Sequence, residues 1–191
     1  AVRYLYSSPG LNVQLRANSF AYDVQTQVEN DPTGRAQRQV PPGSETVFER
    51  IDVQLVGANP NPTLVTDMRS TDYNVFPNVP GRPDGVQVYH YQRITYQAIY
   101  PGIDLVFSRD PTNPARPVKY DFVVHPGADA GLIQLRYTGA PTTLVAGQLQ
   151  FALRHGQLHE EVPASWYEDA QGRHIPVAVR YQALGADGNA A

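Results

Sequence analysis

The chain has 191 residues and a formal net charge of −3, so it can bury one sizeable core, and its charge does not suggest a nucleic-acid-binding protein. It has no cysteine, which excludes disulfides, thiolate metal sites and a cysteine nucleophile. No apolar run approaches the roughly 20 residues that a spanning helix needs, so no membrane insertion is expected. Frequent proline, glycine and tyrosine indicate a turn-rich β protein.

Alternation of apolar and polar residues predicts strands in the first half of the chain. Residues 11–15, 20–24 and 47–55 alternate in this way, which is typical of half-buried strands. Residues 31–43 form a polar stretch with proline and glycine, which predicts a loop. Residues 57–85 are rich in Asn, Pro, Gly and Asp, and we expect a long surface excursion that is either a binding loop or contains a short strand.

The second half of the chain predicts more strands and two hairpins. His155-Gly156 separates two alternating runs, as a two-residue hairpin turn does, and Gly172 occupies a second turn that needs positive φ. No segment has a sustained helical period, so little helix is expected. The strands are predicted at residues 86–91, 103–107, 118–124, 133–137, 149–153, 158–162 and 177–181.

These patterns predict a single domain over residues 1–191, an antiparallel β-sandwich with long surface loops and little helix. The segment "LGADGNAA" ends the chain where a further strand is expected. We therefore expect the domain to be part of a longer polypeptide, with an open sheet edge that another chain or domain can pair with.

Histidines and glutamates near the first hairpin are candidates for a metal or catalytic site. His155 and His159 are four residues apart, the spacing of zinc ligands on a helix, but a hairpin places His155 in the turn and His159 on the returning strand. Glu160 and Glu161 are adjacent on a strand and point to opposite faces, so they cannot both line a glycosidase cleft. We expect these four side chains to be solvated.

Calcium is the one cofactor that the loops suggest. Asp31, Asp110 and Asp187 lie in loops rich in Asp, Asn, Gly and Pro, where oxygen ligands can gather. None of these loops has the spacing of a calcium loop, and Asx turns explain each of them more simply. The sequence also lacks a nucleophile elbow, a phosphate loop and a dinucleotide fingerprint. No cofactor and no catalytic residue is therefore predicted.

Aromatic residues form the candidate ligand surface. Tyr89 and Tyr91 share one face of a predicted strand, and Trp166 and Tyr167 are neighbours on the later hairpin. Amphipathic rings are common both at binding surfaces and in cores, and packing in the core is the more frequent role. The two pairs are nevertheless the candidates for stacking on a sugar.

Asp104 lies one residue inside the apolar strand 103–107 and invites a catalytic interpretation. If this strand pairs with residues 118–124, two registers keep their apolar faces together. One places Asp104 opposite Asp121, the like-charge arrangement of a catalytic carboxylate pair. The other places it opposite Lys119, the only lysine, in a pair that contributes about 0.2–1 kcal/mol. We predict the structural pair Asp104–Lys119.

The chain resembles a known family in specific runs. "ITYQAIYPGIDLVF" and "VKYDFVVHPGADAGLIQLRYTGA" resemble the uncharacterised all-β domain found N-terminal to β-propeller repeats of the SBBP type in large secreted bacterial proteins. "DYNVF", "GQLQFALRHGQLHEEVPASWYE" and "GRHIPVAVRYQALG" extend the resemblance over nearly the whole chain. The resemblance implies an extracellular or cell-surface module of a multidomain protein, and it implies no activity or catalytic residue.

We therefore expect a non-catalytic structural or adhesive module of a secreted or cell-surface bacterial protein. Its expected partners are neighbouring domains of the same polypeptide or other copies of the chain. A glycan-binding module with a polysaccharide partner is the alternative, motivated by the tyrosines and by residues 57–85. A carbohydrate-active enzyme that uses Asp104 and Asp121 is the third hypothesis.

Overall fold

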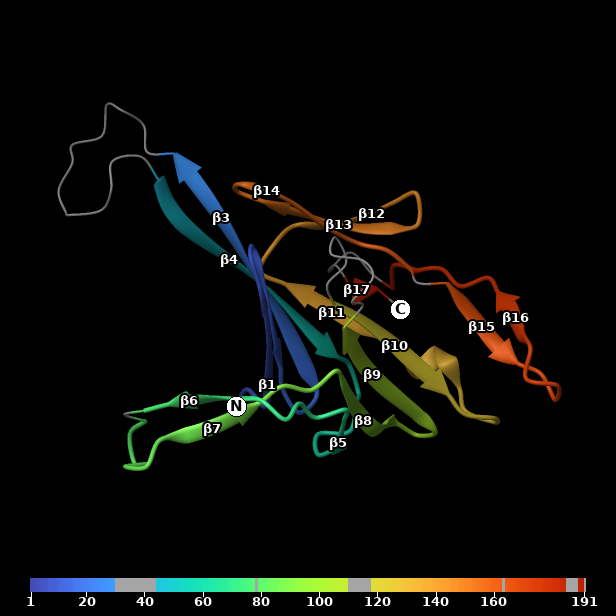
Figure 1. Ribbon diagram of the computed structural model, residues 1–191. Coiled ribbons are helices and arrows are strands. Elements are labelled where there is room, and N and C mark those ends of the chain that lie inside the picture. The colour runs from blue at the N-terminus through green and yellow to red at the C-terminus, as the bar shows by residue number, and fades with distance from the viewer. Residues whose placement is uncertain (30–43, 78, 110–117, 163, 185–188, 191) are drawn as a thin grey trace. The chain divides into compact units, whose positions relative to one another are not determined.

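The computed structural model describes residues 1–29, 44–77, 79–109, 118–162, 164–184 and 189–190. Within these ranges every regular element is a β-strand apart from one turn of 3₁₀ helix, Ala130–Leu132 (Figure 1). All strand pairings between these elements are antiparallel. The predicted all-β antiparallel fold class with little helix is confirmed.

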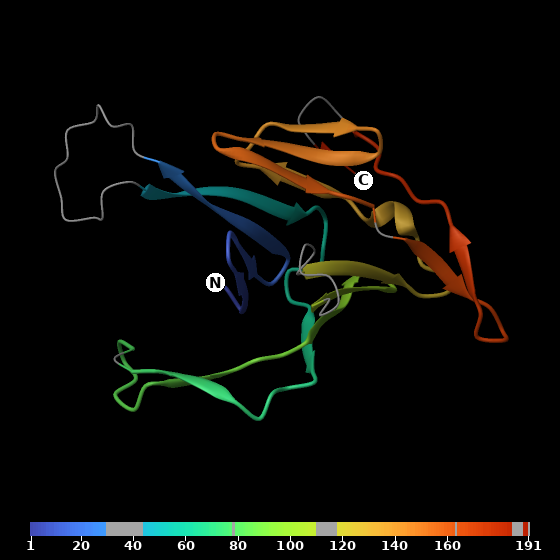
Figure 2. The ribbon, with the colours of Figure 1, turned by 45° about the horizontal axis from the view of Figure 1, so that its top comes forward.

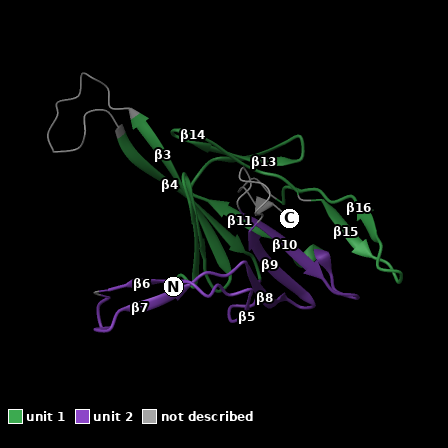
Figure 3. Ribbon diagram, in the orientation of Figure 1, with its two compact units in different colours: residues 1–57, 131–191 green, residues 58–130 purple. Residues whose placement is uncertain are grey.

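The chain divides into two compact units (Figure 3). Unit 1 consists of residues 1–57 and 131–191, and unit 2 consists of residues 58–130. Unit 2 therefore interrupts unit 1 in the sequence. The single domain expected over residues 1–191 stays a prediction.

A six-stranded sheet forms the centre of unit 1. Its order is β1-β2-β3-β4-β11-β17, with alternate residues of β4 buried at Ile51, Val53 and Leu55 as the sequence predicts. β2 has the predicted bounds, whereas β3 and β4 extend beyond the predicted strands. The strands are β1 (Tyr4–Ser8), β2 (Leu11–Leu15), β3 (Ser19–Glu29), β4 (Ser44–Leu55), β11 (Leu135–Thr138) and β17 (Asn189–Ala190).

A three-stranded sheet packs on this sheet within unit 1 (orange in Figure 2). It contains β12 (Thr142–Val145), β13 (Gln148–Leu153) and β14 (Gly156–Glu160). The buried ring of Phe151 on β13 lies with its centroid 5.2 Å from that of Tyr137 on β11. Two antiparallel sheets that share a buried aromatic core are the arrangement of a β-sandwich.

The first predicted hairpin forms between β13 and β14. Its turn residues are Arg154 and His155, and Gly156, with φ at 125°, begins the returning strand. The turn therefore lies one residue earlier than the predicted His155-Gly156. His155 lies in the turn and His159 on the returning strand, as predicted.

The second predicted hairpin forms between β15 (Ser165–Glu168) and β16 (His174–Val177). Gly172 lies in its turn with φ at 74°, as predicted. The strand predicted at residues 177–181 is wrong, because β15 has only four residues and its pairing with β16 ends at Ser165 opposite Val177.

Unit 2 contains a four-stranded sheet in the order β10-β9-β8-β5 and a separate two-stranded ribbon, β6 with β7. Alternate residues of β9, Ile103, Leu105 and Phe107, are buried as predicted. The excursion expected over residues 57–85 contains β5 and β6, so the alternative of a hidden strand is confirmed. The strands are β5 (Thr63–Asp67), β6 (Tyr73–Phe76), β7 (Val86–Tyr89), β8 (Arg93–Tyr100), β9 (Ile103–Arg109) and β10 (Val118–Val124).

Candidate functional site

The register of β9 and β10 separates the predicted pair Asp104–Lys119. Asp104 lies opposite Val123, and Lys119 lies opposite Ser108. The Nζ atom of Lys119 lies 3.0 Å from Oδ2 of Asp121 on its own strand instead. The predicted pair is wrong because β9 and β10 pair along their full lengths. Their register differs by two residues from the one that places Asp104 opposite Asp121, and by four from the one that places it opposite Lys119. Each of these registers keeps the apolar faces of the two strands together.

Asp104 instead holds a bulge in β8. Its Oδ1 accepts a 2.7 Å hydrogen bond from the backbone N–H of Ala98, whose φ of 50° is unusual for a residue with a Cβ atom. Its Oδ2 lies 3.0 Å from Nε2 of His125. The Nδ2 atom of Asn59 donates to the carbonyl oxygen of Ala98. Asp104 therefore binds the irregular backbone of β8, and it does not face Asp121, which lies opposite Val106.

Glu160 is the most deeply buried acid of the described residues. Only 9% of its surface is exposed, and its carboxylate accepts hydrogen bonds from three tyrosine hydroxyls. Tyr22 of β3 donates to Oε2 at 2.9 Å, and Tyr137 of β11 and Tyr181 both donate to Oε1 at 2.8 Å. The expectation that Glu160 is solvated is wrong. The carboxylate connects the six-stranded and the three-stranded sheets with the segment after β16.

Burial changes the chemistry of two of these phenols. It raises the pKa of Tyr22 and Tyr137 well above the ordinary tyrosine value, and the negative charge of Glu160 raises both further. Both hydroxyls therefore stay protonated at neutral pH and act as hydrogen-bond donors. The cluster stabilises the fold of unit 1 by satisfying a buried charge.

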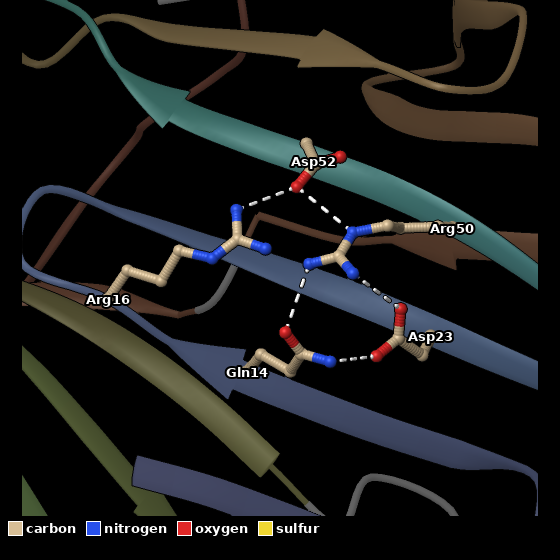
Figure 4. A network of polar contacts seen from close by, with 5 residues as sticks. All are labelled: Gln14, Arg16, Asp23, Arg50 and Asp52. Atoms are coloured by element: carbon tan, nitrogen blue, oxygen red, sulfur yellow. Dashed lines mark hydrogen bonds and ion pairs between the residues drawn. The ribbon is translucent and has the colours of Figure 1, made fainter. Parts of the chain in front are cut away.

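The opposite face of the six-stranded sheet carries a polar network (Figure 4). The guanidinium of Arg50 contacts Gln14 at 3.0 Å, Asp52 at 3.2 Å and Asp23 at 3.6 Å. Nη1 of Arg16 lies 2.9 Å from Asp52, and Gln14 donates to Asp23 at 2.6 Å. Two arginines and two aspartates balance each other here. Exposed pairs of this kind contribute about 0–1 kcal/mol each, and the network leaves no surplus charge among its own members.

The ribbon of β6 and β7 exposes apolar side chains. The ring centroids of Tyr73 and Tyr89 lie 5.6 Å apart, with the ring planes inclined by 53°. The guanidinium carbon of Arg69 lies 4.4 Å from the Tyr89 ring centre. Tyr91 lies beyond the end of β7, so the strand face predicted for Tyr89 and Tyr91 is not formed. The ribbon patch consists of side chains that are exposed by 42–55%: Tyr73, Val75, Phe76 and Val88.

The hairpin of β15 and β16 exposes the other predicted aromatic pair. Trp166 and Tyr167 are 48% and 56% exposed, and alternation places them on opposite faces of the hairpin. The indole of Trp166 stacks on the imidazole of His174, with ring centroids 4.9 Å apart and planes inclined by 25°. The tryptophan face consists of four exposed residues that share one side of this hairpin: Trp166, Glu168, His174 and Pro176.

The hairpin turn beside the tryptophan face is held by Asp169. Its carboxylate accepts hydrogen bonds from the backbone N–H groups of Gln171 and Arg173. It also forms an ion pair with the Arg173 guanidinium at 2.7 Å. These contacts lower the pKa of Asp169, and the hydrogen bond from the Arg173 backbone N–H has the largest effect. Arg173 is therefore engaged with Asp169.

Metal ligands are not gathered in the described part of the chain, which contains no group of three or more His, Asp or Glu side chains able to hold an ion. The calcium candidates Asp31, Asp110 and Asp187 lie outside the described residues, as does the predicted loop 31–43. Among the described residues, no helix has the length and apolar character needed to cross a membrane.

Comparison with known protein families identifies the family of the chain. A model of a domain of unknown function, DUF7948, matches residues 1–189. The chain belongs to the DUF7948 family. No curated protein and no solved structure matches the chain significantly. The predicted position of this DUF7948 domain ahead of propeller repeats stays a prediction.

Sequence reasoning missed two features of this DUF7948 domain. Leu158 and Glu160 are two residues apart on an alternating strand, so the pattern already placed Glu160 on the inward face. The stacking of His174 on Trp166 had no such signal, because it depends on the register of β15 and β16. The same register places Glu168 on the tryptophan face, opposite His174.

Proposed function

We propose that this DUF7948 domain is a non-catalytic structural or adhesive module of a secreted or cell-surface bacterial protein. In this function it assembles with neighbouring domains of the same polypeptide or with other copies of the chain. The resemblance to domains of large secreted bacterial proteins motivates the location.

The ribbon patch carries this proposal. Tyr73 and Val75 lie on one face of the ribbon, and Phe76 and Val88 lie on the other. A two-stranded ribbon is at best marginally stable alone in water, and contiguous exposed apolar side chains mark interaction surfaces. Burial of both faces against a partner removes this apolar area from water. The balanced charges of the Arg50 network support an apolar rather than an electrostatic attachment.

Sedimentation velocity over a wide range of concentrations tests this function. We expect the chain to self-associate reversibly, and the double substitution Phe76→Ser, Val88→Ser to shift association to at least tenfold higher concentration. Val145→Ser on β12 is the matched control, because Val145 is also a large exposed aliphatic residue. A chain that stays monomeric throughout, and that also fails to bind the protein or domain that adjoins it in the native polypeptide, contradicts the proposal.

Glycan binding is the second candidate function. The observation that favours it is the exposed indole of Trp166, which is stacked on His174 rather than buried in a core. Aromatic rings presented in this way bind flat apolar surfaces. Depletion of the chain from solution by insoluble polysaccharides tests this function, and a chain that stays in solution with all of them contradicts it.

A further inference from the structure

The tryptophan face is preorganised for a flat ligand. The imidazole of His174 covers one part of the indole and fixes the plane of Trp166, whose side chain is still 48% exposed. Pro176 lies directly opposite Trp166 across the hairpin, so the two rings are neighbours on the same surface. A ring that is already held in place loses little conformational entropy when a ligand binds.

The tryptophan face also carries a carboxylate that has no partner among the described residues. Glu168 is exposed and lies directly opposite His174, on the face of Trp166. Among the described residues the Glu168 carboxylate has no hydrogen bond or ion pair, whereas the nearby Arg173 is held by Asp169. A free carboxylate offers two oxygens that accept hydrogen bonds from hydroxyl groups, and the imidazole of His174 adds a donor or an acceptor.

We propose that the tryptophan face binds a neutral pyranose unit of a polysaccharide, an inference that rests on the glycan-binding function above. The C–H groups on one side of a pyranose ring are weakly positive and pack on the electron-rich face of the Trp166 indole. Its hydroxyl groups point outward from the ring edge and donate to Glu168.

Two other ligand classes fit this face less well. An anionic sugar is disfavoured because the charge of Glu168 repels a carboxylate or sulfate. An organic ammonium ion is attracted to both an indole and a carboxylate, but cages for such ions enclose them with several aromatic rings. The tryptophan face has one indole and is open along the hairpin, which suits an extended chain of sugars.

Intrinsic fluorescence tests the proposal directly, because Trp166 is the only tryptophan in the chain. The full chain is titrated with soluble β-1,4-glucan, β-1,3-glucan, mannan and dextran, with alginate as the anionic probe and tetramethylammonium as the cationic one. We expect a saturable change in emission with at least one neutral glycan and none with alginate. A change with tetramethylammonium or alginate alone, or with no probe, overturns the proposal.

Variants locate the site by calorimetry with the glycan that binds. We expect Trp166→Ala to weaken binding at least tenfold and Glu168→Gln to weaken it severalfold, while Tyr167→Ala, the neighbouring exposed ring on the other face, binds as the parent chain does. Glu168→Gln leaves the stacked rings intact, so it tests the site even where Trp166→Ala perturbs the hairpin. Equal binding by all three variants would show that the tryptophan face is not the binding site, although the chain binds glycans. Failure of the parent chain to bind any polysaccharide, soluble or insoluble, removes both.

Discussion

The hydroxyl of Tyr181 donates a 2.8 Å hydrogen bond to Oε1 of Glu160, which connects the segment after β16 to the last strand of the three-stranded sheet. Tyr137 donates to the same oxygen from the six-stranded sheet. Three parts of unit 1 therefore depend on one carboxylate. Removing its charge affects all three at once.

Glu160→Gln is expected to destabilise the protein by about 3 kcal/mol, because the amide replaces one accepting oxygen with an NH₂ donor that faces phenolic donors. The free energy of unfolding is measured by urea titration with far-UV circular dichroism. Glu161→Gln is the matched control. Its side chain accepts a hydrogen bond from Gln148 at an exposed position, so it should change stability by less than about 0.5 kcal/mol. Equal unfolding midpoints for the two variants contradict the role assigned to Glu160.

Stability is expected to fall as the pH rises above about 10. Tyrosines of the unfolded chain lose their protons near pH 10, whereas burial and the charge of Glu160 keep Tyr22 and Tyr137 protonated in the folded protein. The folded state then binds more protons than the unfolded state, so a contribution that is fully present below pH 10 is lost progressively above it. Melting temperatures between pH 8 and pH 11 measure this loss.

The double variant Tyr22→Phe, Tyr137→Phe provides the control for the alkaline loss. It removes the two phenols whose pKa is raised while keeping both rings. It should be less stable at pH 8 and should lose less further stability between pH 9 and pH 11. An unchanged slope in this range would show that other groups cause the alkaline transition.

Strand positions were predictable from the sequence because alternation is a local signal. β2 and β10 have the bounds that the pattern indicates, and the apolar faces of β9 and β10 meet as expected. Register was not predictable, because a shift of two residues keeps the same side chains inward and leaves the pattern satisfied. The observed register lies two such steps from the predicted one, so Asp104 lies opposite Val123 rather than opposite Lys119.

The surroundings of Glu160 could be predicted only in part. Its spacing from Leu158 indicates an inward side chain, but the three phenols come from strands and segments far apart in the chain. Local patterns carry no information on which distant residues satisfy a buried charge.

Asp104→Ala is expected to cost about 1–3 kcal/mol, because the N–H of Ala98 loses its acceptor in the bulge of β8. Asp121→Ala is the matched control on the neighbouring strand and removes only an ion pair with the half-exposed Lys119, so it should cost less than about 1 kcal/mol. Hydrogen exchange at the Ala98 amide should accelerate in the first variant alone. Protection of that amide in Asp104→Ala contradicts the bulge-holding role.

Gly139→Ala is expected to cost about 3 kcal/mol or more. Gly139 has φ at 104°, and a Cβ atom there would overlap the carbonyl oxygen of Arg50. Gly147→Ala separates the cost of the positive φ from the cost of the steric overlap. Gly147 has φ at 82°, and a Cβ atom there would meet no other atom within 4 Å. This variant should therefore cost about 1 kcal/mol from the backbone conformation alone. Thermal unfolding measures both, and equal costs would show that the close approach to Arg50 is unimportant.

The interruption of unit 1 by unit 2 has a consequence for the order in which the chain can fold. β4 and β11 pair directly, with Leu55 opposite Leu135, so this sheet requires the chain to close a loop that contains all of unit 2. During synthesis residues 58–130 emerge as one continuous segment before β11 exists. Unit 2 can therefore acquire structure on the ribosome while the sandwich of unit 1 waits for its last strands, and slow, late closure of unit 1 is expected from the entropy of so long a loop.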